Sequence, residues 1–209
     1  MKDILIKIIP VGMLETNCYI VGDPASGEGI IIDPGDEFSK IAAAIDNTKL
    51  KIKYLINTHG HHDHIGADWQ VKEKYGCRIL IHEEDAGMLG NPLLNLSFKK
   101  DRSEVKDLQA DQLLQEGDVV SAGAIKLEVI HTPGHTPGCI CLLGNGYLFT
   151  GDTLFAGAVG RTDLPGGSFE KLNNSIQTKL KPLPDTLKIY PGHGASSTIG
   201  REKRENPFM

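Results

Sequence analysis

The sequence predicts an α+β fold in which two β-sheets pack against each other and helices cover their outer faces. Each half of the 209-residue chain is rich in β-type segments that helical segments interrupt, and such a pattern is typical of layered folds. Three runs, at residues 29–33, 53–56 and 147–149, are almost continuously apolar. Runs of this kind suit strands that are buried on both faces, between a second sheet and a layer of helices.

The first half predicts five strands and three helices. Helical spacing of Phe38, Ile41, Ala42 and Ile45 indicates a helix with Asp36 as its N-cap. Further helices are expected at Ala67–Tyr75, which Gly76 ends, and at 83–89, before a surface segment that reaches residue 115. The strands are expected at Asp3–Ile9, Asn17–Gly22, Gly29–Asp33, Lys53–Asn57 and Cys77–Ile81.

The second half predicts five strands and two helices. The tripeptide Gly144-Asn145-Gly146 is typical of a hairpin turn. Helices are expected at Phe169–Leu180 and Ile199–Glu205. The strands are expected at Asp118–Val120, Ile125–Ile130, Cys139–Leu143, Tyr147–Thr150 and Leu187–Tyr190. Because no repeat or linker divides the chain, we expect residues 1–209 to form a single domain.

Composition narrows the classes of protein to consider. With 40% hydrophobic and 23% charged residues, the chain is expected to be globular, not disordered or membrane-spanning. A net charge of −5 argues against nucleic acid as a partner. The four cysteines form no C-x-x-C motif, and we expect them to be buried and free. Since no signal peptide is recognisable, a soluble cytoplasmic protein is expected, while its oligomeric state stays open.

Histidine is concentrated in one short segment. Four of the eight histidines lie within residues 59–64, where the sequence is HGHHDH directly after a predicted strand. The pattern H-x-H-x-D-H offers the imidazoles of His59, His61 and His64 and the carboxylate of Asp63. Neutral imidazole and carboxylate are ligands that zinc, iron and manganese share. On a loop, this spacing can divide the ligands between two neighbouring metal ions.

Three later strands also end in a turn that carries one potential ligand. These residues are His135, Asp152 and His193, each beside glycine, with proline also at the two histidine turns. A single histidine or aspartate at a strand end is more often a turn or capping residue. Four such strand ends in one chain favour a metal site instead.

The four motifs together resemble the metallo-β-lactamase superfamily, and within it the glyoxalase II (hydroxyacylglutathione hydrolase) branch. They are H-x-H-x-D-H at 59–64, T-P-G-H-T-P-G at 132–138, G-D-T-L-F at 151–155 and P-G-H-G at 191–194. The resemblance implies a four-layer αββα sandwich with its metal site at one edge, between the sheets. It also implies two divalent metal ions, for which zinc is favoured and iron or manganese are alternatives. The first ion would take His59, His61 and His135, the second Asp63, His64 and His193, and Asp152 would bridge them.

The resemblance leaves several nearby residues with open roles. Asp33 either orients a ligand imidazole or simply forms the turn before Pro34. His62 is expected to be exposed or to support a ligand. His131 is expected to support the turn that carries His135. His82 is expected to be structural.

The segment Gly151–Pro165 also resembles the glyoxalase II branch, where a basic residue nine positions after the bridging aspartate contacts the glutathione part of the substrate. Arg161 occupies that position here, with a solvated surface arginine as the alternative. The family's two tyrosines are replaced by Asp163 and Ala195. The chain ends sixteen residues after His193, so we expect no C-terminal helical domain. These departures leave the thiol part of the substrate open.

The resemblance implies a binuclear metal-dependent hydrolase for a small-molecule thioester such as S-D-lactoylglutathione. Asp63 and Asp152 would act in catalysis, and metal coordination would make hydroxide available at neutral pH. The alternative is a mononuclear iron persulfide dioxygenase of the same fold, which would use the His59, His135 and Asp152 positions. A lactonase or β-lactamase is a third alternative, RNA processing a fourth, and a non-catalytic metal-binding protein the alternative outside enzymes.

Overall fold

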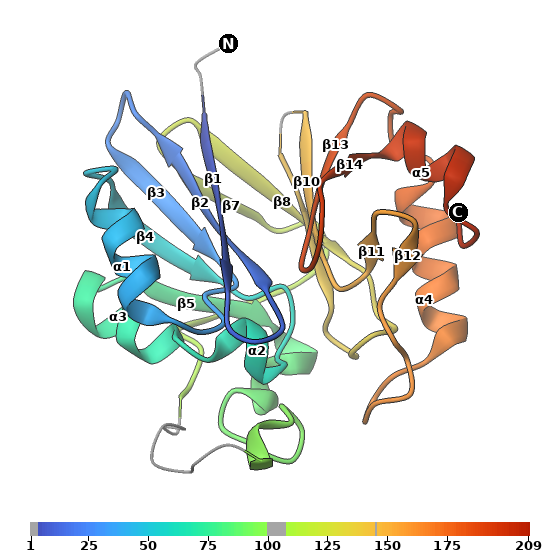
Figure 1. Ribbon diagram of the computed structural model, residues 1–209, viewed down its shortest axis with the longest axis horizontal. Coiled ribbons are helices and arrows are strands. Elements are labelled where there is room, and N and C mark those ends of the chain that lie inside the picture. The colour runs from blue at the N-terminus through green and yellow to red at the C-terminus, as the bar shows by residue number, and fades with distance from the viewer. Residues whose placement is uncertain (1–3, 100–107, 145) are drawn as a thin grey trace.

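The computed structural model describes residues 4–99, 108–144 and 146–209, and it contains two six-stranded β-sheets that face each other (Figure 1). The first sheet has the strand order β1-β2-β3-β4-β5-β6. Strands β1 to β3 pair antiparallel, and β3 to β6 pair parallel. Its strands are β1 (Leu5–Val11), β2 (Thr16–Asp23), β3 (Glu28–Ile32), β4 (Lys51–Ile56), β5 (Arg78–His82) and β6 (Gln112–Leu114).

The second sheet comes from the second half of the chain and has the order β14-β13-β10-β9-β8-β7. Strands β10 and β13 are parallel, and the other neighbours are antiparallel. Its strands are β7 (Val119–Ala122), β8 (Ile125–His131), β9 (Ile140–Leu143), β10 (Tyr147–Gly151), β13 (Lys188–Pro191) and β14 (Ser197–Thr198). A separate hairpin of β11 (Leu154–Phe155) and β12 (Ala158–Val159) follows β10.

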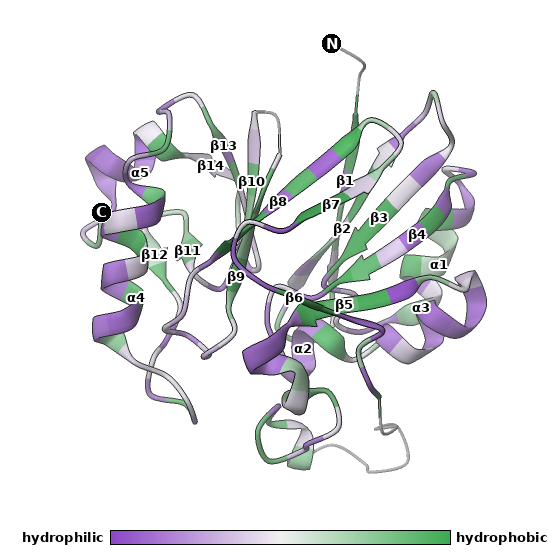
Figure 2. Ribbon diagram, turned by 180° about the vertical axis from the view of Figure 1, so that it is seen from behind, coloured by the Kyte–Doolittle hydropathy of each residue, from purple (hydrophilic) through white to green (hydrophobic). Residues whose placement is uncertain are grey.

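Helices lie on the outer face of each sheet, and their polar sides face away from the strands (Figure 2). Helices α1 (Phe38–Asp46) and α3 (Asp68–Tyr75) cover the first sheet, with the short α2 (His62–Ile65) near the seam between the sheets. Helix α4 (Phe169–Ser175), a π-helical turn at Ile176–Leu180, and α5 (Ile199–Glu205) cover the second sheet. None of the described helices is long and apolar enough to cross a membrane.

The predicted doubly buried strands are confirmed. In β3, Ile30 and Ile32 join the apolar core between the sheets, while Ile31 joins the core beneath α1 and α3. In β10, Phe149 faces the other sheet and Leu148 faces α4. Side chains alternate between faces along a strand, so a continuous apolar run fills both cores at once. The chain therefore forms the expected α+β sandwich of four layers.

Several local predictions need correction. Asp36 is not the N-cap of α1: Glu37 holds that place with a left-handed backbone (φ 47°), and the Asp36 carboxylate accepts the Glu37 N–H. The helix expected at 83–89 is a 3₁₀ turn at Glu83–Met88. The pattern did not predict β6, β11, β12 or β14, which have two or three residues each and are too short to show a period. The β9–β10 hairpin is confirmed, although Asn145 lies outside the described residues. All four cysteines are buried and free, as expected.

One edge of the sandwich collects the ends of strands from both sheets. Strands β3, β4 and β5 run parallel, so their carboxyl ends lie together. Strands β8 and β10 are both antiparallel to β9, and β13 is parallel to β10, so these three strands also end together. An isolated bridge between Thr16 and His193 joins the two edges. Every predicted ligand follows one of these strand ends, which explains how residues so far apart in sequence meet.

Candidate metal centre

The structure brings all seven predicted ligands together at this edge. Ligand atoms of His59, His61 and His135 lie within 4.8 Å of one another, and so do those of Asp63, His64 and His193. A third group of the same size joins His59, His64 and Asp152, and so connects the first two. His59 and His61 leave the end of β4, and Asp63 and His64 belong to α2. His135, Asp152 and His193 follow β8, β10 and β13.

Asp152 lies between the two groups of ligands. Its Oδ1 is 3.4 Å from His64 Nε2. Its Oδ2 is 3.6 Å from both His135 Nε2 and His193 Nε2. The carboxylate therefore lies near His135 of the first predicted group and near His64 and His193 of the second, which is the placement that a bridging carboxylate needs.

Unpaired buried atoms at the centre of the cluster fit a cation. The Nε2 atoms of His59 and His61 and the Oδ1 atom of Asp152 are buried without a hydrogen-bond partner. Buried polar atoms nearly always have a partner, so three such atoms in one cluster call for an explanation. The ring nitrogens His61 Nδ1 and His135 Nε2 also approach to 2.9 Å. Imidazole nitrogens and carboxylate oxygens that converge in this way form a donor set suited to a divalent metal ion.

The two sides of the cluster differ in charge. Burial and the neighbouring imidazoles hold the pKa of His59 well below its ordinary value and lower that of His61 to about 3. Both rings are therefore neutral, the form that binds metals. Burial also opposes a charge on His64, but Asp152, Asp63 and Asp33 outweigh it and raise the pKa of His64 to about 10. In the metal-free chain, a proton on His64 therefore offsets part of the negative charge of Asp152, Asp63 and Asp33.

Outer contacts orient three of the ligand imidazoles. Asp33 Oδ2 lies 3.0 Å from His64 Nδ1, and the same carboxylate accepts the N–H and the hydroxyl of Thr58, each at 2.7 Å. Of the two roles considered for Asp33, contact with a ligand is the one observed. Backbone carbonyls accept from the other two rings: Arg161 from His135 Nδ1 at 2.6 Å, and Leu14 from His193 Nδ1 at 2.9 Å. A proton held on Nδ1 leaves Nε2 free to bind a metal.

Glycines allow the ligands to approach the backbone closely. A Cβ added to Gly192 would lie 2.2 Å from Asp152 Oδ1 and 2.8 Å from His64 Cε1. A Cβ on Gly35 would lie 1.5 Å from the Asp63 carbonyl oxygen. Any larger residue at either position would therefore displace the segments that carry the ligands.

Asp85 is a site residue that the sequence pattern did not predict. It lies in the 3₁₀ turn after β5, and its buried carboxylate accepts from Gly60 N–H at 3.0 Å, from Thr136 Oγ1 at 2.6 Å and from Gly138 N–H at 2.6 Å. It thereby joins the loop of His59 and His61 to the loop of His135. Its place just past a strand end at the same edge of the sheet was the signal that could have identified it.

The remaining histidines lie where they were expected. His131 Nε2–H donates to the Pro137 carbonyl at 2.9 Å, so His131 supports the turn that carries His135. His82 stacks on His131 with ring centroids 3.9 Å apart, and its Nδ1 accepts the Glu84 N–H, a structural role. His62 is half-buried and contacts Asp63 Oδ1 at 3.3 Å.

The predicted substrate residue Arg161 lies at the rim of the cluster. Its carbonyl contacts His135, whereas its side chain is exposed and pairs with Asp163. The guanidinium of Arg161 is therefore a solvated surface group, and only its backbone contacts a predicted ligand.

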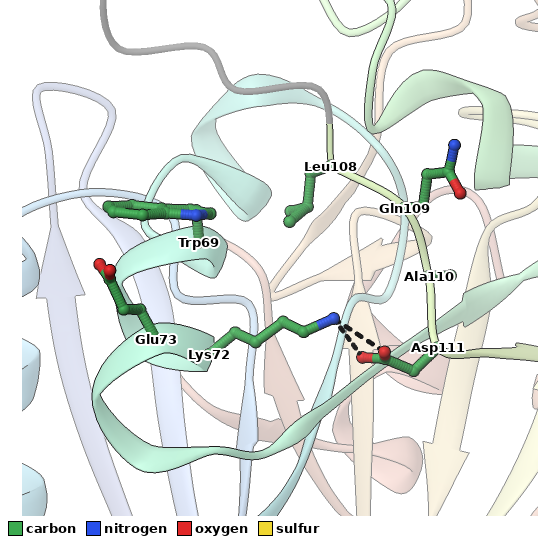
Figure 3. A pocket seen from close by; sticks show the side chains of 7 residues that line it. All are labelled: Trp69, Lys72, Glu73, Leu108, Gln109, Ala110 and Asp111. Carbon is green, nitrogen blue, oxygen red and sulfur yellow. Dashed lines mark hydrogen bonds and ion pairs between the residues drawn. The ribbon is translucent and has the colours of Figure 1, made fainter.

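A surface pocket of about 700 Å³ on the outer side of α3 contains none of the predicted ligands (Figure 3). It lies between Trp69, Lys72 and Glu73 and residues 108–111, and Lys72 is paired there with Asp111.

Comparisons with known proteins agree with this fold. Residues 11–193 match the family model of the metallo-β-lactamase superfamily. The chain is 40% identical over 207 residues to hydroxyacylglutathione hydrolase GloC of Haemophilus influenzae, covering 98% of this chain and 97% of the relative. The crystal structure of the BLEG-1 B3 metallo-β-lactamase has a TM-score of 0.91 at 34% identity, covering 98% and 99%. The structure of TTHA1623 in a di-iron-bound form has a TM-score of 0.84 at 31% identity, covering 97% and 100%.

Proposed function

The chain belongs to the metallo-β-lactamase superfamily, and from that premise we propose that it is a metal-dependent hydrolase of thioesters with two divalent ions in its site. The observation that supports two ions is the position of Asp152, which lies between a group of three histidines and a second group of Asp63, His64 and His193. A single ion would leave one of these groups unused.

Each of the two ions would have its own set of protein ligands. His59, His61 and His135 would hold one ion, Asp63, His64 and His193 the other, and Asp152 both. When bound, two such ions would make hydroxide available at neutral pH and polarise a carbonyl group. Two dications carry four positive charges, of which Asp63, Asp152 and a hydroxide would cancel about three. The site would keep a net positive charge, which suits the oxyanion and the thiolate that thioester hydrolysis produces.

A thioester is favoured as the substrate by the relative named as a hydroxyacylglutathione hydrolase and by the segment 151–165. The backbone of Arg161 contacts the predicted ligand His135, and its exposed side chain would face the thiol part of the substrate. Zinc is the metal we favour, and the di-iron form of TTHA1623 keeps iron as the alternative. The similarity to the BLEG-1 β-lactamase makes β-lactam hydrolysis the second candidate activity.

Metal analysis combined with substrate assays tests the proposal. We expect about two metal equivalents per chain and hydrolysis of S-D-lactoylglutathione or a related thioester, without oxygen consumption when a persulfide is supplied. One iron equivalent with oxygen uptake would instead support the dioxygenase, and turnover of β-lactams alone would support the second candidate.

The variant Asp152→Ala should bind at most one metal equivalent and lose most thioester hydrolysis. The matched control is Asp118→Asn, an exposed carboxylate directly before the edge strand β7 that accepts the Gln115 N–H. Retention of both metals and of full activity in Asp152→Ala would refute the two-ion site.

A further inference from the structure

The first residue of β2, Thr16, contacts a predicted ligand of the second ion through its side chain. Thr16 Oγ1 donates to Asp63 Oδ2 at 3.1 Å, and Thr16 is fully buried. This oxygen of Asp63 is the one that faces the other two ligands of its group, at 3.5 Å from His64 Nε2 and 3.3 Å from His193 Nε2. The second oxygen, Oδ1, lies 3.3 Å from His62 Nδ1. The Thr16 hydroxyl therefore acts on the carboxylate oxygen that is placed to bind an ion.

The backbone at the start of β2 is tied to the loop that carries His193. Thr16 and His193 form an isolated antiparallel bridge. The N–H and the side-chain amide of the next residue, Asn17, donate to three backbone carbonyls on both sides of His193, at 2.7, 3.0 and 2.9 Å. One short stretch of β2 thus holds His193 through backbone carbonyls and Asp63 through a hydroxyl.

A hydroxyl in this position can support an ion without competing with it. A carboxylate oxygen has two lone pairs, so Asp63 Oδ2 can accept from Thr16 and still offer a lone pair to a metal. The hydroxyl has a fixed place, because Thr16 pairs with Val11 of β1 within the sheet. Such a donor opposes rotation of the carboxylate and favours the arrangement in which Oδ2 faces His64 and His193.

We propose that Thr16 is a positioning residue that sets the affinity of the second ion, the one assigned to Asp63, His64 and His193, and leaves the affinity of the first ion unchanged. The proposal rests on the proposed two-ion site and deepens it, because it assigns control of one ion to a residue that is not a ligand. Loss of the hydroxyl should let Asp63 turn away from the two imidazoles and weaken binding of this ion about tenfold.

Zinc binding by variants with only one intact group of ligands tests the proposal. In the background His61→Ala/His135→Ala, which disables the first group, competition with a zinc chelator gives the Kd of the second ion. Thr16→Val keeps the shape of threonine without its hydroxyl and should raise this Kd about tenfold. Thr16→Ser keeps the hydroxyl and should retain the Kd of the background. In Asp63→Ala the hydroxyl has lost its acceptor, so Thr16→Val should change no Kd there.

Three results would overturn the proposal. An unchanged or tighter Kd in Thr16→Val would mean that the hydroxyl does not support the ion. Equal weakening with and without Asp63 would mean that Thr16 acts through the backbone and not through this carboxylate. A background with a disabled first group that binds no zinc would mean that the second group is not an ion site. The matched control is Thr178→Val, whose hydroxyl donates to the Asn174 carbonyl at 2.7 Å in an exposed position, and it should leave every Kd unchanged.

Thioester assays keep this inference apart from the proposed function. If the wild type hydrolyses no thioester, the proposed function fails, yet the Kd values for zinc still decide the role of Thr16. If hydrolysis is found but Thr16→Val binds the second ion as tightly as its background, only the inference fails. Circular dichroism shows whether each variant is folded, and Thr16→Ala takes the place of Thr16→Val if the valine variant does not fold.

Discussion

Replacement of Asp85 by asparagine should loosen the metal centre without touching a ligand. The carboxylate is fully buried and accepts three hydrogen bonds, two on Oδ2 from Gly60 and Thr136 and one on Oδ1 from Gly138. Burial raises its pKa, although these three donors oppose the shift. An amide of the same shape has one oxygen and one NH₂ group. If the NH₂ replaces Oδ1, the Gly138 N–H faces a donor and loses its partner.

The expected cost follows from these contacts. A hydrogen bond to a charged group contributes about 1.5–3 kcal/mol, and the two remaining bonds weaken when the acceptor becomes neutral. Removal of a buried charge offsets part of this loss. We therefore expect Asp85→Asn to lower the free energy of unfolding by about 2–3 kcal/mol. In a chain of this size that corresponds to a drop in melting temperature of about 5–10 °C.

Two measurements check the reasoning. Urea unfolding of the metal-free protein gives the stability change, and a competition assay with a chelator gives the metal affinity. Because Asp85 joins the His59 loop to the His135 loop, we expect metal affinity to fall about 10- to 100-fold. The control Asp118→Asn should change stability by no more than about 0.5 kcal/mol. An Asp85→Asn protein as stable and as metal-avid as this control would refute the role of Asp85 as the connection between the loops.

Three further perturbations have outcomes that the structure specifies. Gly192→Ala should lose metal affinity, since its Cβ would lie 2.2 Å from Asp152 Oδ1, and equilibrium dialysis showing two ions held as tightly as in the wild type would contradict this. Glu202→Gln should lower stability by about 1–3 kcal/mol while metal content stays unchanged, because buried Glu202 accepts from Gly157 N–H, Asn206 Nδ2 and Ser197 Oγ. Burial, and to a lesser extent His131, lowers the pKa of His82 in the folded chain. As the pH falls below about 6.5, the unfolded chain therefore binds a proton at this residue before the folded chain does. The metal-free wild type should therefore lose stability between pH 7 and 5, and His82→Phe should flatten that slope, whereas an unchanged slope would assign the loss to other groups.

The fold was largely predictable because its central strands are buried on both faces. In β3 and β10, consecutive apolar residues serve two cores, and few other arrangements use such runs. The short strands β11, β12 and β14 could not be predicted, because two residues show no periodicity. The N-cap of α1 was misplaced by one residue for a different reason. Glu37 turns its carboxylate to the Gly12 N–H instead of to the helix, which is a tertiary contact and leaves no local signal.

The candidate ligands were predictable because each one follows a strand within a short motif rich in glycine. Most of the residues that support them were not, with His131 an exception and Asp33 a partial one. Asp85 has no motif of its own, and only the parallel order of β4 and β5 places it near Gly60. Its contacts to Thr136 and Gly138 cross from one sheet to the other, and sequence separation hides contacts of that kind.

Two of the ligands are held by contacts that do not depend on a side chain. His135 and His193 are held by the carbonyls of Arg161 and Leu14, while the side chains of these two residues are largely exposed. A backbone carbonyl makes the same contact whatever side chain its residue carries. Substitutions at positions 14 and 161 can therefore change the exposed side chains beside the cluster while the ligand imidazoles keep their orientation. The residues around the cluster can therefore vary in charge and shape at no cost to the metal centre.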